Sequence, residues 1–184
     1  MKRLFILGLA ISLAACGGAA RAADPSAAGF WKQVDDAGRV GAWFYFVDKS
    51  GVFEGRLVKM FPKPGEPDVP NCLKCEGTQK NAPMLGLVLV KGMKRDGLKY
   101  EGGTILDPRD GSVYNAQMQV SPDGQKLFVR GYLGLPILGQ TQTWLRLPDN
   151  TMATADIPPE SASPDVKAPG PPKAPTPAPH KPKP

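Results

Sequence analysis

The sequence predicts an all-β fold, an eight-stranded antiparallel up-and-down barrel. Short apolar segments of alternating polarity follow one another between residues 29 and 147, and turns that contain Asp-Gly or Gly separate most of them. No long segment shows the apolar period of about 3.6 residues that is typical of a helix. Closing such a meander into a barrel removes its exposed edges. The expected strands are 29–34, 41–47, 52–60, 85–93, 98–106, 112–120, 126–133 and 141–147.

Alternation is clearest in the segment 112–120. Tyr114, Ala116, Met118 and Val120 share one face, and the Asn and Gln residues between them share the other. A period of two residues is the signature of a strand whose two faces meet different surroundings. This segment therefore supports a β-sheet rather than a helix.

Residues 1–23 have the features of a signal peptide. Two basic residues precede the apolar run 4–15, which is shorter than the roughly 20 residues of a membrane-spanning helix. Two processing sites compete: residues 13–16 resemble a lipobox, in which Cys16 would become a lipid anchor, and residues 20–22 form an A-x-A cleavage site. We expect an exported protein, either periplasmic or an outer-membrane lipoprotein.

Two segments remain after the signal. Residues 24–149 form one domain of ordinary size, which contains the expected barrel and a long proline-rich loop at 61–83. Residues 150–184 are rich in proline, alanine and lysine, a composition that predicts a disordered tail. Such a tail suits a spacer that contacts peptidoglycan or another envelope protein.

The charge of the domain argues against nucleic acid as a partner. Residues 24–155 contain 16 Lys and Arg against 14 Asp and Glu, which leaves the domain close to neutral. Binding to phosphate backbones needs clustered basic side chains, and the sequence has no basic run interleaved with aromatic residues.

Cys72 and Cys75 form a C-x-x-C pair within the long loop. In an oxidising compartment the simplest expectation is a structural disulfide. A redox pair of thioredoxin type would open a helix, which the sequence after Glu76 does not predict. Half of a zinc site is the third alternative, but the sequence has no second cysteine pair.

The sequence favours a non-enzymatic protein without a metal or cofactor. Its only histidine, His180, lies in the tail, so the domain cannot build a Ser-His-Asp or Cys-His catalytic group. The acidic candidates for paired carboxylates are Glu54, Glu101, Asp107 and Asp110, but the segment 107–111 is better explained as a turn.

Gly29, Trp31 and Arg146 resemble the structural signature of lipocalin or calycin barrels. In those proteins a G-x-W on the first strand packs under a basic side chain of the last strand and closes one end of the barrel. The resemblance implies that Arg146 lies across the Trp31 ring, within about 6 Å of its centroid, where cation–π attraction stabilises the contact.

Longer motifs resemble the domain-of-unknown-function 2147 family of exported bacterial proteins. They are LGL at 85–87, YEGGTILDP at 100–108, DGSVY at 110–114, VRGYLG at 129–134 and LGQTQTWLR at 138–146, together with the G-x-W at 29–31. The resemblance implies a lipocalin-like barrel and supplies no chemistry. The proline-rich tail departs from it.

Polar and aromatic residues of the last strands could line the mouth of the barrel. Arg130, Gln142, Trp144 and Tyr114 are the expected ligand-binding residues, and the expected partner is a small, mostly apolar molecule. An outward, solvated face is the alternative explanation of this set. The corresponding alternative function is a structural or interaction module of the cell envelope, with the tail as its spacer.

Overall fold

The structure is a computed structural model that describes residues 24–161. The expected signal peptide, both of its processing sites and residues 162–184 lie outside the described residues. Within the described part, no helix is long and apolar enough to span a membrane.

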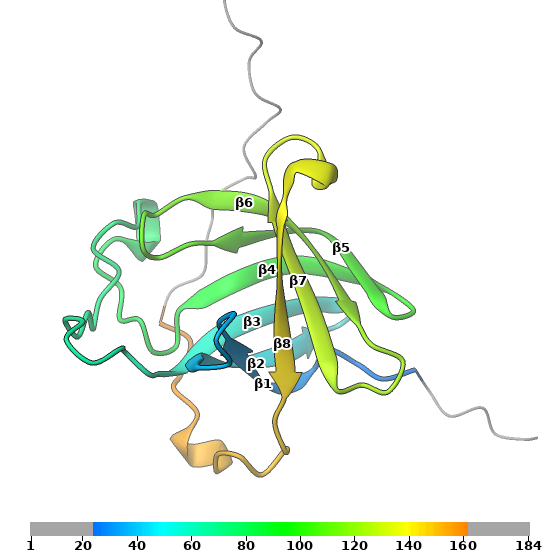
Figure 1. Ribbon diagram of the computed structural model, residues 1–184, viewed down its shortest axis with the longest axis horizontal. Helices are drawn as coiled ribbons and strands as arrows, with labels where there is room; N and C mark the ends of the chain where they lie inside the picture. The colour runs from blue at the N-terminus through cyan, green and yellow to red at the C-terminus, as the bar shows by residue number, and fades with distance from the viewer. Residues whose placement is uncertain (1–23, 162–184) are drawn as a thin grey trace, which may run out of the picture.

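Eight antiparallel strands close into one barrel, as the sequence predicts (Figure 1). Each strand pairs with the next, and β8 pairs with β1 to complete the circle. Three single 3-10 turns, η1 (Gly77–Gln79), η2 (Pro136–Leu138) and η3 (Thr154–Asp156), lie outside the sheet. The strands are β1 (Gly29–Val34), β2 (Val40–Lys49), β3 (Val52–Met60), β4 (Val88–Asp96), β5 (Lys99–Leu106), β6 (Val113–Val120), β7 (Lys126–Tyr132) and β8 (Gln140–Arg146).

The largest shift in a strand boundary is at β4, which begins three residues later than the sequence predicts. The apolar residues before it belong to a turn, in which Leu87 donates its backbone N–H to the Met84 carbonyl at 3.2 Å. Gly86 within this turn has a φ of +89°, which a regular strand does not allow. Apolar character alone could not distinguish this buried turn from the strand that follows it.

Up-and-down topology gives the barrel two different ends. The hairpins β2–β3, β4–β5 and β6–β7 lie at one end, together with the chain that enters β1 and leaves β8. We call this the closed end. The connections β1–β2, β3–β4, β5–β6 and β7–β8 lie at the other, which we call the open end.

Aromatic rings fill the middle of the barrel. Phe44 stacks on Trp144 with the ring centroids 4.1 Å apart, and Phe53 meets Tyr100 edge-on at 4.9 Å. Phe46 lies directly over Gly55, where any Cβ atom would collide with its ring. These rings belong to one continuous core with inward-facing residues of every strand. The lumen at this level is therefore occupied by protein side chains.

Arg146 and Trp31 plug the closed end. The Arg146 guanidinium lies 4.0 Å from the centroid of the Trp31 ring, so the contact expected from the sequence is present. Its Nε donates to the Gly124 carbonyl at 2.5 Å, Nη1 donates to the Ala28 carbonyl at 2.9 Å, and Nη2 donates to the Ser26 carbonyl. Burial lowers the pKa of Arg146, and the three hydrogen bonds replace the water that its charge has lost.

The chain that precedes β1 is fixed by the same cluster. Trp31 donates its indole N–H to the Ala27 carbonyl at 2.8 Å, and the Ala27 N–H donates to the Tyr100 hydroxyl at 2.8 Å. Gly29 has a φ of +108°, and a Cβ there would lie 3.2 Å from Arg146 Nη1. The glycine of the G-x-W motif thus allows both the turn into β1 and the approach of the guanidinium.

The chain after β8 packs along the outside of the barrel (Figure 1). Lys49 pairs with Glu160 at 3.0 Å. Ser161 donates its backbone N–H to the Gly86 carbonyl at 3.0 Å and its hydroxyl to the Pro83 carbonyl at 2.9 Å. Residues 150–161, which the sequence assigns to a disordered tail, therefore have defined contacts with the β3–β4 loop and with β2.

We predict that Arg146→Ala lowers the free energy of unfolding by about 3–5 kcal/mol, because it leaves three carbonyls without donors and uncovers the Trp31 ring. Arg146→Lys should still lose about 2 kcal/mol, because an ammonium lacks the planar fork. Urea unfolding followed by circular dichroism measures both. Arg109→Lys, at an ion pair whose arginine side chain is 84% exposed, is the control and should change stability by less than about 1 kcal/mol. Equal effects at both arginines would contradict the role of Arg146.

We also predict that a chain that ends at Ala155 is less stable than one that ends at Ser161, by about 1–3 kcal/mol. The shorter chain loses the two hydrogen bonds of Ser161 and the ion pair of Glu160, which contributes least because it is exposed. Thermal and urea unfolding of the two truncated chains give the comparison. Coincident unfolding curves would show that residues 156–161 add nothing to the fold.

Candidate functional site

The open end is where inward-facing side chains meet solvent. Residues opposite each other on paired strands share a face of the sheet. Gln142 lies opposite the buried Val129, and Gln33 lies opposite the buried Trp144, so both glutamines point into the lumen. Nevertheless Gln142 is exposed and Gln33 is only half-buried. Solvent therefore reaches the lumen from this end.

A hydrogen-bonded group of three side chains marks the boundary between the aromatic core and the open end. Gln142 Oε1 accepts from the Trp144 indole N–H at 3.1 Å and from Gln33 Nε2 at 2.6 Å. The indole can only donate, so its partner on Gln142 must be the carbonyl oxygen. This fixes the orientation of both amides. Gln142 keeps its NH₂ group as a donor, and Gln33 keeps its carbonyl oxygen as an acceptor.

Tyr114 lies across the lumen on β6. It is opposite Ile105 of β5 and two residues from Ala116, which is fully buried, so its side chain faces inward. A Cβ added at Gly131 of β7 would lie 3.2 Å from Ile105 Cγ2 and 3.7 Å from Tyr114 Cβ, which shows that these three positions adjoin. Tyr114 is half-buried and belongs to the wall that solvent can reach.

Arg130 lies on the outer face of the barrel. It alternates with Val129 and Gly131, which face inward, and its guanidinium binds the β7–β8 loop. Of the four residues expected to bind a ligand, the structure therefore brings Gln142, Trp144 and Tyr114 to the lumen and places Arg130 outside it.

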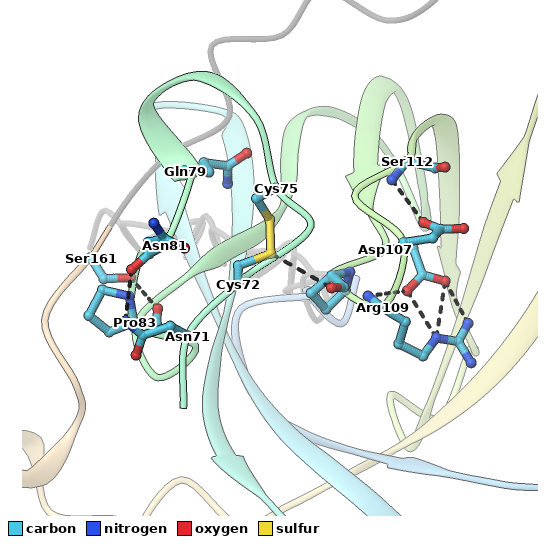
Figure 2. Close-up of a disulfide and its surroundings, with 12 residues drawn as sticks. Asn71, Cys72, Cys75, Gln79, Asn81, Pro83, Asp107, Arg109, Ser112 and Ser161 are labelled. Atoms are coloured by element: carbon cyan, nitrogen blue, oxygen red, sulfur yellow. Dashed lines mark hydrogen bonds and ion pairs between the residues drawn. A yellow bond between two sulfur atoms is a disulfide. The ribbon is translucent and has the colours of Figure 1, made fainter. Parts of the chain in front are cut away.

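The long β3–β4 connection lies at the open end, and a disulfide between Cys72 and Cys75 ties it (Figure 2). This bond was the first of the three alternatives for the cysteine pair. Both cysteines are buried in the same core as the lumen residues, together with Ala82 and Met84 of this loop. The loop thus extends the apolar core to the rim of the barrel.

The disulfide packs against the β5–β6 turn (Figure 2). Cys72 Sγ lies 3.7 Å from the Pro108 carbonyl, and Gly111 lies so close to the Lys74 carbonyl that no Cβ would fit between them. Within the turn, hydrogen bonds from Arg109 hold the pKa of Asp107 below its usual value. Asp107 is therefore ionised at neutral pH, which suits a turn residue and not a proton donor.

The described residues contain no cluster of three or more His, Cys, Asp or Glu that could hold a metal ion. Of the inward-facing residues described above, only Arg146 at the closed end is charged. The side chains of Gln33, Gln142, Trp144 and Tyr114 therefore offer amide, indole and phenol groups beside an apolar wall, an arrangement that suits a neutral molecule.

Gln33 is the site residue that the sequence did not single out. Its signal was the alternation that begins at Trp31: if Trp31 faces the lumen, Gln33 must do so as well. Its pairing with Gln142 spans 109 residues of sequence and depends on the closure of β1 on β8, so no local pattern contains it.

Comparisons with known proteins agree with this geometry. A family model described as "Uncharacterized protein conserved in bacteria (DUF2147)" matches residues 29–146, from β1 to β8. A comparison with curated proteins found no match. Among solved structures, protein HP1028 of Helicobacter pylori, described as belonging to the lipocalin family, has a TM-score of 0.59 and 17% identity, over 72% of this chain and 96% of that chain. At this identity the likeness concerns the fold alone. The chain belongs to the DUF2147 family and folds as a lipocalin-like barrel.

Proposed function

We propose that this protein binds a small, mostly apolar ligand at the open end of its barrel, without catalysing a reaction on it. The observation that carries the proposal is the Gln33–Gln142–Trp144 group, which presents oriented polar atoms at the end of an apolar lumen. Ligand sites are typically apolar walls with a few placed polar groups. The lipocalin-like fold supports the same function.

The free polar atoms suggest the chemistry of the ligand. Gln142 offers an amide donor and Gln33 an amide acceptor, and neither carries charge. A primary amide, an ester or an alcohol on an apolar body would satisfy them, whereas a bare hydrocarbon would cover these polar atoms and leave them unpaired. We infer a neutral ligand with one hydrogen-bonding end.

The depth of the lumen limits the size of the ligand. Phe44 stacks on the ring of Trp144, and both side chains are buried, so a ligand can extend only from the Trp144 level to the rim. The same filling favours a second candidate function, a structural or interaction module of the envelope, in which the barrel serves as a scaffold. The binding experiment below separates the two.

We further propose that the protein works outside the cytoplasm, in the periplasm or as an outer-membrane lipoprotein. The features of residues 1–23 motivate this proposal, and the Cys72–Cys75 disulfide is consistent with it because such bonds persist in oxidising compartments.

Ligand binding is tested by displacement of the neutral probe N-phenyl-1-naphthylamine with medium-chain fatty amides, alcohols and hydrocarbons. We predict that Gln142→Leu weakens binding of the amide by about tenfold, because it removes one hydrogen bond of about 1–1.5 kcal/mol, and leaves the hydrocarbon unaffected. Thr143→Val, which changes the next residue of β8 on its outer face, is the matched control. Native mass spectrometry of the protein from its own envelope would identify the natural ligand.

If the parent protein binds neither probe nor amides saturably, the ligand function is wrong and the scaffold function stands. A loss of amide and hydrocarbon binding that is the same in Gln142→Leu and in Thr143→Val would place the binding site elsewhere.

Intact mass of the protein from the exporting cell tests its location. We predict an envelope species that begins either at a lipidated Cys16 or at Ala23 or Asp24, because these are the ends that the two processing sites would leave. A full-length species that persists in the cytoplasm at steady state would contradict export by either route.

A further inference from the structure

The loop between β7 and β8 carries an apolar tip. Among the described residues its Leu135, Ile137 and Leu138 are the most exposed large apolar side chains, at 66%, 80% and 77%, and Leu133 adds 49%. The loop projects beyond the rim of the barrel as a convex tip (Figure 1). Clustered exposure of this kind marks an interaction surface, whereas single exposed apolar residues do not.

Three carbonyls of this tip, those of Leu135, Pro136 and Ile137, have hydrogen-bond partners within the chain. Leu138 donates its N–H to the Leu135 carbonyl at 3.1 Å, and Gly139 donates to the Pro136 carbonyl at 3.0 Å. Arg130 donates to the carbonyls of Pro136 at 2.6 Å and Ile137 at 3.1 Å, and the proline has no N–H of its own. The three carbonyls at the apex are therefore all paired within the chain.

Paired carbonyls are what an apolar medium requires of a loop. Water can donate hydrogen bonds to exposed carbonyls, so a loop in water does not need to pair them internally. In hydrocarbon no such donor exists, and each unpaired carbonyl raises the free energy by several kcal/mol. The exposed leucine and isoleucine side chains and the internally paired carbonyls of Leu135, Pro136 and Ile137 thus both lower the free-energy cost of placing this tip at a lipid surface.

Arg130 provides the complementary charge. Its three nitrogens bind the loop carbonyls and the Thr141 hydroxyl at 2.7 Å, all of which are neutral. Of its five N–H groups three are used in these bonds, and two remain. Residues 131–148 contain no acidic side chain. The guanidinium lies at the base of the apolar tip, where a phosphate of a lipid headgroup would meet it.

We propose that the β7–β8 loop docks on a phospholipid surface, with Leu135, Ile137 and Leu138 in the interfacial acyl layer and Arg130 at the phosphates. A protein partner would have to supply a matching apolar groove, while a lipid layer accepts a convex tip of any detailed shape. The remaining N–H groups of Arg130 and the absence of acidic side chains from residues 131–148 favour lipid. This surface is separate from the ligand group inside the lumen.

The test uses sedimentation with vesicles of phosphatidylethanolamine and phosphatidylglycerol. The protein used is the chain from Asp24 to Pro184, which leaves out the expected signal peptide. All residues of the hydrophobic core lie within this chain. The double variant Ile137→Ser with Leu138→Ser should lower the partition coefficient by about tenfold or more. Leu73→Ser, which removes a side chain that is 65% exposed in the β3–β4 loop, is the matched control and should stay within about twofold.

Charge and depth are tested separately. Arg130→Gln should weaken binding about fivefold at low salt, and the difference should shrink as salt rises, whereas Arg130→Lys should retain part of the effect. A tryptophan introduced as Ile137→Trp should shift its emission to the blue on vesicles and be quenched by lipids brominated on their acyl chains. Unfolding of each variant without vesicles confirms that the fold is intact.

Vesicle binding that the double variant retains would overturn the proposal, as would a parent protein that does not bind vesicles. In the second case the tip would be assigned to a protein groove. Neither result bears on ligand binding, which is measured without lipid.

Discussion

The half-buried Arg146 guanidinium is the interaction on which the closed end of the barrel depends. A buried charge is tolerated only when hydrogen bonds replace its water, and Arg146 finds three carbonyls for this purpose. Two of them, Ser26 and Ala28, belong to the chain before β1, and the third belongs to the β6–β7 hairpin. One side chain of the last strand therefore binds the chain that enters the first strand, beside the β1–β8 pairing that closes the barrel.

Closure of one end determines what the other end can do. Trp31 and Arg146 fill the closed end and aromatic rings cross the middle, while Gln33 and Gln142 meet solvent at the open end. The disulfide-tied loop lies at this same end and shares its core with the lumen. The closed end thus provides a base held by hydrogen bonds, and the long β3–β4 connection lies at the opposite, open end.

The sequence predicted most of the architecture because its signals were local. Hairpin glycines and two-residue alternation are read over ten residues or fewer, and they located all eight strands. The Trp31–Arg146 contact is long-range, but a family resemblance supplied it. The Gln33–Gln142 contact could not be predicted, because neither a local sequence pattern nor a family motif points to it. The sequence placed Arg130 at the mouth of the barrel, whereas its side chain lies on the outer face. A polar residue on a strand can face the lumen or the solvent, and only the register of β7 with β8 shows which face Arg130 occupies.

Arg130 and Arg146 show how the face of the sheet on which a side chain lies decides what that side chain can do. Both lie on the last two strands, and both use a guanidinium to pair the carbonyls of a segment outside the sheet. Arg146 faces inward, where its charge is half-buried and its guanidinium binds the chain before β1. Arg130 faces outward, where its fork orders an exposed loop and part of its charge remains available to an anion. The same chemistry therefore closes the barrel at one end and, on our proposal, prepares a surface for lipid at the other.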